Sequence, residues 1–347
     1  MKFDILKCHG SGNDFVLIDE TERELGLDEP SRVRLVTELC RRGGLIGSDG
    51  LLFVQRSGAG ADAKMRFFNT DGSEAEMCGN GVRCVGRFVA EKTGKDEVVI
   101  ETMRRHIPIR RAGELFPGLP AFDVKIGEPS LDPATLPMNA RRERHIDAPI
   151  PELHPTLRFT ALSIPNPHIV AFVDTFEPEL IELAERANAA PSGNGPAPEG
   201  RSVFPRGVNV SFVKVLGRRS IFVLTYERGV GVTNSCGTAM SASSFVACLL
   251  GHCDPGAPIE VYNKGGMVTC LVDGDADAAA RAAAPVHLVG NATYVFSAEV
   301  GIPSVEAPSA AWSVGEKRPF DAENRQYDLF VRSVAERLDT ESFFRIP

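Results

Sequence analysis

Two short stretches, Glu76-Met77-Cys78-Gly79-Asn80-Gly81 and Asn234-Ser235-Cys236-Gly237-Thr238-Ala239, share one pattern in this chain of 347 residues. In each, a cysteine is followed by a glycine and a small polar residue. Nine residues before each cysteine stands a polar residue with an aromatic in front of it, Phe68-Asn69 and Tyr226-Glu227. A helix-compatible run follows each cysteine, at 82–92 and 240–250. The pattern predicts strand, loop, Cys-Gly-polar and helix twice, and therefore two similar halves.

A cysteine at the start of a helix is suited to proton transfer. A thiol has an ordinary pKa of about 8.5, and a helix N-terminus favours the thiolate. The free N–H groups of the first turn can also hold a carboxylate. Two such cysteines could invert a carbon, because one thiolate removes a proton from one face while the other thiol donates to the opposite face. The alternative is a pair of buried structural cysteines, but the matched flanks of Cys78 and Cys236 favour the acid–base pair.

The composition is that of a soluble globular protein. Apolar residues make up 43% and charged residues 24%, with a net charge of −8 and no basic stripe that would indicate nucleic-acid binding. We find no apolar run long enough to span a membrane, and the N-terminus, 1–7, alternates like a strand rather than a signal peptide. Eight cysteines without a secretory segment indicate free thiols in a reducing compartment.

No metal site is predicted. Cys248, His252 and Cys253 lie close together, but a second Cys/His pair at a matching spacing is missing. The loop around Gly10 and Gly12 lacks the Gly-Lys-Ser/Thr ending of a phosphate loop and is not a dinucleotide fingerprint.

The strand and helix patterns predict two α/β halves followed by a tail. We place the N-terminal half at 1–128 plus 289–302, the C-terminal half at 129–288 and the tail at 303–347. A polar helix is expected at 29–42, and strands are expected at 98–102, 121–126, 161–164, 168–173, 208–215, 221–226 and 292–300. The stretch 188–205 is rich in Ala, Pro and Gly and predicts a mobile surface loop. In the tail, Tyr327, Phe330, Val334 and Leu338 recur at helical spacing, which predicts a short amphipathic helix docked on the body, with a partner-binding helix as the alternative.

Several polar residues outside the cysteine stretches are candidates for a site, and each has a plainer explanation. The segment from His9 to Phe15 is also typical of a hairpin turn, and Asn69 lies in a turn-like sequence. Asn209 sits in an apolar run, where its amide could bond the neighbouring backbone instead of a ligand. Glu227-Arg228 could be a surface ion pair.

Taken in order, these segments resemble the diaminopimelate epimerases, a family that works without pyridoxal phosphate. The resemblance covers about residues 1–300 and rests mainly on 69–84, with weaker support from 9–15, 166–168 and 226–238. It implies two pseudo-symmetric domains, each a curled, mostly antiparallel sheet around a central helix, with the active site in the cleft between them. It also implies a cytoplasmic homodimer that makes meso-diaminopimelate for lysine and peptidoglycan, with no cofactor and no metal.

Carried over residue by residue, the resemblance assigns a catalytic pair and a set of substrate-binding residues. The catalytic pair is Cys78 and Cys236. The substrate-binding residues are Asn13, Asn69, Gly79, Asn80, Asn166, His168, Asn209, Glu227, Arg228, Gly237 and Thr238. The chain departs from the usual family pattern at Gly50, Pro165, Val232 and Ala239. Relative to that pattern, we also expect the loop at 188–205 to be inserted and the tail after about residue 302 to be extra.

Two other functions remain open at this point. Racemases of other amino acids, such as proline or histidine, also use two cysteines, and a substrate panel with chiral analysis would separate them from the first hypothesis. A non-catalytic amino-acid-binding protein is the alternative from another class. Retention of both cysteines argues against it, and solvent deuterium at an α-carbon would exclude it.

Overall fold

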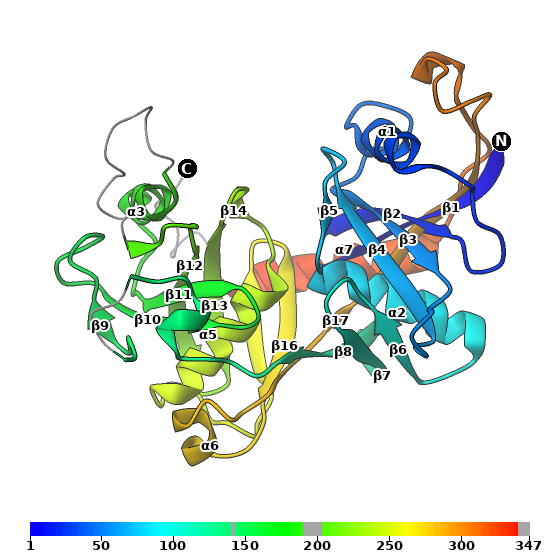
Figure 1. Ribbon diagram of the computed structural model, residues 1–347. Helices are drawn as coiled ribbons and strands as arrows, with labels where there is room; N and C mark the ends of the chain where they lie inside the picture. The colour runs from blue at the N-terminus through cyan, green and yellow to red at the C-terminus, as the bar shows by residue number, and fades with distance from the viewer. Residues whose placement is uncertain (140–142, 190–202, 339–347) are drawn as a thin grey trace, which may run out of the picture. The chain divides into compact units, whose positions relative to one another are not determined.

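The computed structural model divides the chain into two compact units (Figure 1). It describes residues 1–139, 143–189 and 203–338. The first unit comprises Met1–Val124 and Val289–Phe330, and the second comprises Lys125–Leu288 and Val331–Pro347. The mobile loop predicted at 188–205 lies mostly outside the described residues.

The first unit contains two helices, α1 and α2, and most of a third, α7, among strands that are mostly antiparallel. In chain order the elements are β1 (Lys2–Gly10), β2 (Asn13–Asp19), α1 (Glu29–Cys40), β3 (Gly50–Gln55), β4 (Ala63–Asn69), β5 (Glu74–Ala75), α2 (Gly79–Thr93), β6 (Glu97–Glu101), β7 (His106–Phe116), β8 (Leu119–Gly127), β18 (Thr293–Gly301), the 3-10 turn η2 (Ser309–Ala311), β19 (Ser313–Val314), β20 (Arg318–Pro319) and α7 (Asp321–Leu338). Strand β8 and helix α7 run on into the second unit.

The second unit has a similar succession. Its elements are η1 (Pro133–Thr135), β9 (Ala148–Pro149), β10 (Arg158–Ser163), β11 (Pro167–Phe172), α3 (Pro178–Asn188), β12 (Asn209–Gly217), β13 (Ser220–Glu227), β14 (Gly231–Thr233), α5 (Gly237–Leu249), β15 (Ile259–Asn263), β16 (Gly266–Val272), α6 (Ala276–Ala280) and β17 (Val286–Asn291), which returns the chain to the first unit.

The order of strand pairing is the same in both units. The pairs β1–β2, β3–β4 and β6–β7 are antiparallel, and β2–β3 and β4–β6 are parallel. In the second unit β10–β11, β12–β13 and β15–β16 are antiparallel, and β11–β12 and β13–β15 are parallel. The repeated Cys-Gly-polar stretch is therefore one part of a repeated fold.

One helix in each unit is enclosed by its sheet. Helix α2 contacts β1, β2, β3, β4, β6 and β7, and α5 contacts the corresponding six strands, β10, β11, β12, β13, β15 and β16. Almost every residue of α5 is buried, and the helix carries no charged side chain, which is typical of a helix without a face toward solvent. In α2, Gly86 lets the helix approach β7, because a Cβ at this position would lie 2.5 Å from a methyl carbon of Ile109.

The short turns of the chain follow from its local sequence. Strands β1 and β2 form a hairpin in which Gly10 pairs with Asn13, and the two turn residues Ser11 and Gly12 have φ values of 54° and 78°. Positive φ at both central positions is what a two-residue hairpin turn of type I′ requires. Helix α2 ends at Gly94, whose φ of 70° forms a left-handed cap.

The predicted fold class is confirmed: each half is an α+β unit with a mostly antiparallel sheet around a central helix. The structure has a helix at 29–40 and a strand at every predicted position, with ends that differ by one to three residues. The helix in the tail is longer than predicted, since α7 spans 18 residues, and its Phe330, Val334 and Leu338 are buried.

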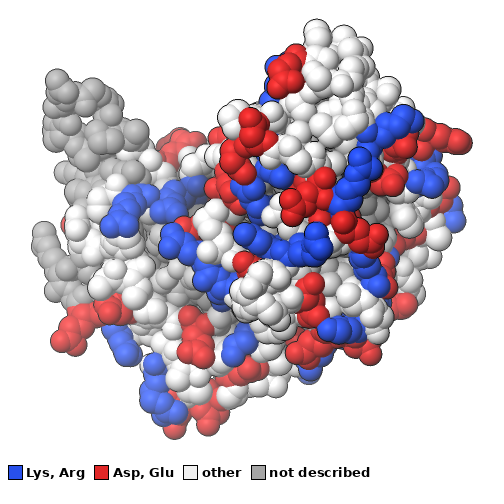
Figure 2. Space-filling view, turned by 45° about the vertical axis from the view of Figure 1, so that its right-hand side comes forward, with Lys and Arg blue, Asp and Glu red and all other residues white. Residues whose placement is uncertain are grey.

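The distribution of surface charge and the state of the cysteines agree with what the composition predicts. Acidic and basic side chains are interspersed on the face shown in Figure 2, without a continuous basic stripe. None of the eight cysteines, all of which lie in the described part of the chain, forms a disulfide. Over the described part of the chain, none of the helices has the length and apolar character needed to cross a membrane.

Candidate active site

In each unit, one edge of the sheet collects the polar residues singled out in the sequence. In the first unit Asn13 begins β2 and Asn69 ends β4, and Gly50 at the start of β3 pairs with Asn69. In the second unit Asn166 precedes β11, Asn209 begins β12 and Glu227 ends β13. Parallel neighbours begin at the same edge of a sheet, and an antiparallel neighbour ends there. The strand order therefore brings these residues together at equivalent positions.

Cys78 is the residue that caps the N-terminus of α2. Its backbone is extended, with φ −135° and ψ 116°, and its sulfur accepts a hydrogen bond from the Gly81 N–H at 3.4 Å. On the other side, the Cys78 thiol donates to Oδ1 of Asn13 at 3.7 Å. The residues next along the helix, Gly79 and Asn80, are buried and present the first N–H groups of α2. This end of the helix can therefore receive an anion beside a thiol.

Cys236 occupies the same position on α5, with φ −125° and ψ 112°. Its sulfur lies 3.5 Å from the hydroxyl oxygen of Thr238, and its exposed fraction is 8%. Burial raises the pKa of the Cys236 thiol well above its ordinary value, and the negative charge of Glu227 raises it further. Both effects favour the thiol form of Cys236 over the thiolate.

His168 is fully buried and neutral. Burial, assisted by the positive charge of Arg228, lowers the pKa of His168 to about 3. The Nε2 atom of His168 lies 2.8 Å from Oδ1 of Asn166. Because an amide oxygen only accepts, Nε2 carries the hydrogen and donates a hydrogen bond to that oxygen. The Asn166 carbonyl is thereby occupied, and its NH₂ group is left as the donor that a carboxylate needs. Nδ1 of His168 has no hydrogen-bond partner among the described residues.

The other predicted polar residues of the second unit are tied into the same edge. Oδ1 of Asn209 accepts from the backbone N–H of Arg228 at 2.9 Å, which shows that its amide bonds the neighbouring backbone. The Thr233 hydroxyl donates to Glu227 at 2.6 Å. The Arg228 side chain is exposed and donates to the carbonyl of Arg206 at 3.2 Å.

The first unit is less polar at this edge than the second. Phe15 and Gly50 pair in register there, where the second unit pairs His168 with Asn209. A side chain at position 50 is blocked, because a Cβ would lie 2.8 Å from the backbone oxygen of Phe68. Asn69 is bound to the turn that follows it, because its backbone N–H donates to the backbone oxygen of Ser73 at 2.9 Å and its side chain donates to the Ser73 hydroxyl at 3.0 Å.

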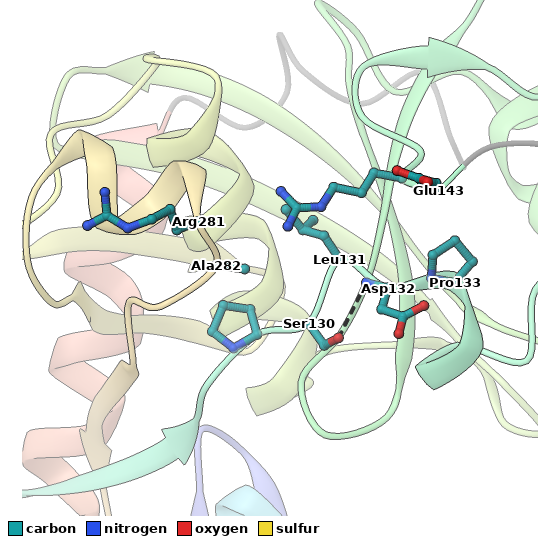
Figure 3. Close-up of a pocket in the computed structure, with 9 residues that line it drawn as sticks. Ser130, Leu131, Asp132, Pro133, Glu143, Arg281 and Ala282 are labelled. Atoms are coloured by element: carbon teal, nitrogen blue, oxygen red, sulfur yellow. Dashed lines mark hydrogen bonds between the residues drawn. The ribbon is translucent and has the colours of Figure 1, made fainter.

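A separate cavity of about 600 Å³ lies in the second unit (Figure 3). It is lined by Pro129, Ser130, Leu131, Asp132, Pro133, Glu143, Arg144, Arg281 and Ala282. It contains none of the residues predicted for the site, and its ionisable side chains are spread around a surface hollow. We assign no chemistry to it.

Comparison with known proteins shows the family of this chain. The sequence profile described as "Diaminopimelate epimerase" matches residues 5–113 and 160–288, which is more than half of the chain. This chain belongs to the diaminopimelate epimerase family. It is 42% identical over 331 residues to a protein of Clostridium acetobutylicum named diaminopimelate epimerase, with 95% of this chain and 94% of the relative covered.

Solved structures outside the diaminopimelate epimerases share the fold. A phenazine biosynthesis protein of the PhzF family from Bacillus anthracis has a TM-score of 0.59 at 18% identity, covering 87% of this chain and 100% of that one. A hydroxyproline epimerase from Agrobacterium vitis, solved with bound trans-4-hydroxy-L-proline, has a TM-score of 0.55 at 17% identity, with coverages of 86% and 92%. At these identities the likeness concerns the fold alone.

The match to the diaminopimelate epimerase of Clostridium acetobutylicum also bears on the tail. Only a twentieth of this chain lies outside that match. The part of the chain outside the match is shorter than the tail at 303–347, so this relative shares at least part of the tail.

Two residues that contact the predicted site were missed in the sequence. Asp49 accepts a hydrogen bond from Asn13 at 2.9 Å, and the buried Arg83 donates to Asn80 at 2.9 Å. Arg83 stands within the cysteine stretch itself, one helical turn beyond Asn80, which was the available signal. For Asp49 no such signal exists, since only the pairing of β2 with β3 brings it to Asn13.

Proposed function

We propose that this protein converts LL-2,6-diaminopimelate to meso-diaminopimelate, a step in the biosynthesis of lysine, without pyridoxal phosphate or another cofactor. The relatives that cover nearly the whole chain carry the name diaminopimelate epimerase. The observation that carries the proposal is the equivalence of Cys78 and Cys236. Both cap the N-terminus of the central helix of their unit, with nearly the same backbone angles.

The chemistry follows from that equivalence. One cysteine, as the thiolate, removes the α-proton, and the electron pair remains on the α-carbon. The other cysteine, as the thiol, donates its proton to the opposite face of that carbon. The configuration inverts, and the two sulfurs exchange their protonation states, so the reverse reaction uses the same pair. The high pKa of Cys236 supports the thiol as its resting form.

The helix ends supply the charge stabilisation that this step needs. The α-proton of an amino acid becomes more acidic when its carboxylate is held by positive charge or by N–H donors, because negative charge develops beside it in the transition state. We assign this role to the first N–H groups of α2 and α5, at Gly79, Asn80, Gly237 and Thr238. Asn13, Asn69, Asn166, His168, Asn209, Glu227 and Arg228 are proposed to hold the remaining polar groups of the substrate.

Replacement of each cysteine tests the proposal. Cys78→Ala and Cys236→Ala should each abolish the conversion of LL- to meso-diaminopimelate. Cys78→Ser and Cys236→Ser should retain only a trace of activity, because a hydroxyl is a much weaker acid than a thiol. Buried Cys248→Ser is the matched control, since it changes a thiol on α5 that lies outside the proposed site. Near-normal turnover by Cys236→Ala would overturn the two-base mechanism.

A substrate panel addresses the other activity on this scaffold. Purified protein is incubated with LL-diaminopimelate, proline, histidine and lysine, and the products are separated on a chiral column. Conversion of diaminopimelate alone is the expected result. Preferential racemisation of proline or histidine would place the chain with the other two-cysteine racemases.

The family resemblance also supports a homodimer in the cytoplasm, and we include both in the proposal. Sedimentation equilibrium of the purified protein should give twice the mass of the chain, which is 37.5 kDa. A monomer at micromolar concentration would remove the dimer from the proposal without affecting the assignment of the reaction.

A further inference from the structure

A row of four side chains runs past the sulfur of Cys78, and both of its ends are charged. Arg83 donates from Nη2 to Oδ1 of Asn80 at 2.9 Å. Asn80 donates from Nδ2 to Oδ1 of Asn13 at 3.3 Å. Asn13 in turn donates from Nδ2 to Oδ2 of Asp49 at 2.9 Å. The row therefore has a cation at one end, an anion at the other and two amides between them.

The charged ends determine which way each amide points. A guanidinium can only donate hydrogen bonds, so Asn80 must turn its oxygen toward Arg83. An ionised carboxylate can only accept them, so Asn13 must turn its NH₂ group toward Asp49. The carbonyl oxygen of Asn13 is then left on the side of Cys78, where the thiol donates to it at 3.7 Å.

Both ends of the row are held firmly in place. Arg83 is fully buried, and its Nε donates to the backbone oxygen of Asn291 at 3.1 Å. Asp49 is bound to the start of β2, because its backbone N–H donates to the oxygen of Asp14 at 2.9 Å. Arg42 contacts the other carboxylate oxygen of Asp49 at 2.6 Å. The orientation of the two amides is therefore a fixed property of the first unit.

We propose that Asp49 and Arg83 are positioning residues, which hold the carbonyl oxygen of Asn13 toward Cys78 so that this cysteine faces an acceptor rather than a donor. An acceptor favours the thiol, whereas an NH₂ group in the same place favours the thiolate. If Asn13 turned over, Cys78 would lose its proton at lower pH, and the balance between the two sulfurs would change. This inference rests on the proposed role of Cys78 as a catalytic acid and base.

Two substitutions at Asp49 separate the orientation of the amide from the loss of charge. In Asp49→Asn the amide oxygen can still accept from Asn13, although the negative charge and the ion pair with Arg42 are gone. In Asp49→Ala the charge is also gone and no acceptor remains, so only the hydrogen bond from Asn80 still opposes the turning of Asn13. Both variants should fold, because the side chain of Asp49 is 42% exposed.

The readout is the pH dependence of Cys78 alkylation by iodoacetamide. Trypsin releases a peptide spanning 67–83 in which Cys78 is the only cysteine, so mass spectrometry follows this residue alone. We expect the midpoint of alkylation in Asp49→Ala to lie about one pH unit below that in Asp49→Asn. Equal midpoints in the two variants would overturn the proposal. This assay needs no turnover, so its outcome is independent of whether the wild-type protein epimerises diaminopimelate.

Discussion

Arg87 on α2 and Glu323 in the first turn of α7 form a bidentate ion pair, with 3.0 Å between Nη2 and Oε2. Both side chains are nearly buried, at 8% and 12% exposure. Glu323 also accepts from the backbone N–H of Tyr294 at 3.0 Å, and the Arg87 guanidinium lies 3.7 Å from the centre of the Tyr294 ring. The ion pair thus fixes the start of α7 to the central helix and to β18.

Loss of Glu323 should therefore destabilise the first unit. Glu323→Ala leaves Arg87 without its buried partner, and breaking a buried pair from one side costs on the order of 3 kcal/mol. Glu91→Ala is the matched control, because Glu91 pairs with the same arginine but is 38% exposed. This variant should lose less than about 0.5 kcal/mol. Urea unfolding of both variants measures the difference, and equal losses would show that the buried contact has no special weight.

Two buried histidines should make the protein sensitive to acid. Burial lowers the pKa of His9 to about 4 and that of His168 to about 3. The unfolded chain binds these protons from about pH 6.5 downward, whereas the folded chain does not until the lowered values are reached. The contribution of these two histidines to the free energy of unfolding is therefore fully present above pH 6.5 and is lost as the pH falls. Between pH 7.5 and 5 each histidine should cost about 2 kcal/mol.

Replacement of His168 tests this acid sensitivity. His168→Phe introduces the residue that stands at the equivalent position of the first unit, Phe15. Urea unfolding at pH 7.5 and at pH 5 should show a loss about half as large as in the wild type, after allowance for other groups that titrate in both proteins. If the variant lost as much free energy of unfolding as the wild type, the pKa of His168 in the folded protein would not be lowered.

Selectivity for both ends of diaminopimelate is a further expectation. Lysine lacks only the distal carboxylate, and a site built to bind that group leaves its own polar atoms unpaired with lysine. Lysine should therefore be a poorer substrate by roughly four orders of magnitude in kcat/KM. Arg228→Ala should lower the activity on diaminopimelate strongly without changing the fold, because the Arg228 side chain is exposed. Comparable rates on lysine and diaminopimelate would contradict this expectation.

Local signals in the sequence predicted the parts of the site that depend on nearby residues. The Cys-Gly-polar stretches predicted both helix starts, because the cap and the following helix are adjacent in the chain. The hairpin at Ser11-Gly12 was recognisable for the same reason. The strand patterns gave the fold class and most strand positions, although their ends depend on pairing that a single strand does not reveal.

Contacts between distant parts of the chain were not predictable in this way. Asp49 meets Asn13 only because β2 and β3 pair in parallel, and Arg87 meets Glu323 across 236 positions of sequence. The tail helix was recognised from its apolar spacing but judged too short. The first turn of α7 carries Asp321 and Glu323 instead of apolar residues. The apolar spacing therefore does not reveal this turn, which is held by the contact of Glu323 with Arg87.

Solvent deuterium tests the two-cysteine mechanism most directly. Purified protein is incubated briefly with LL-diaminopimelate in deuterated water. The stereoisomers are then separated, and the deuterium content of each is measured by mass spectrometry. Because the thiol that donates exchanges with solvent, the meso product should carry one deuterium at the inverted α-carbon. The recovered LL-isomer should still carry hydrogen, since the proton removed by one sulfur is not returned to the same face. Deuterium in the recovered LL-isomer at the same rate as in the product would indicate a single base and would contradict the mechanism.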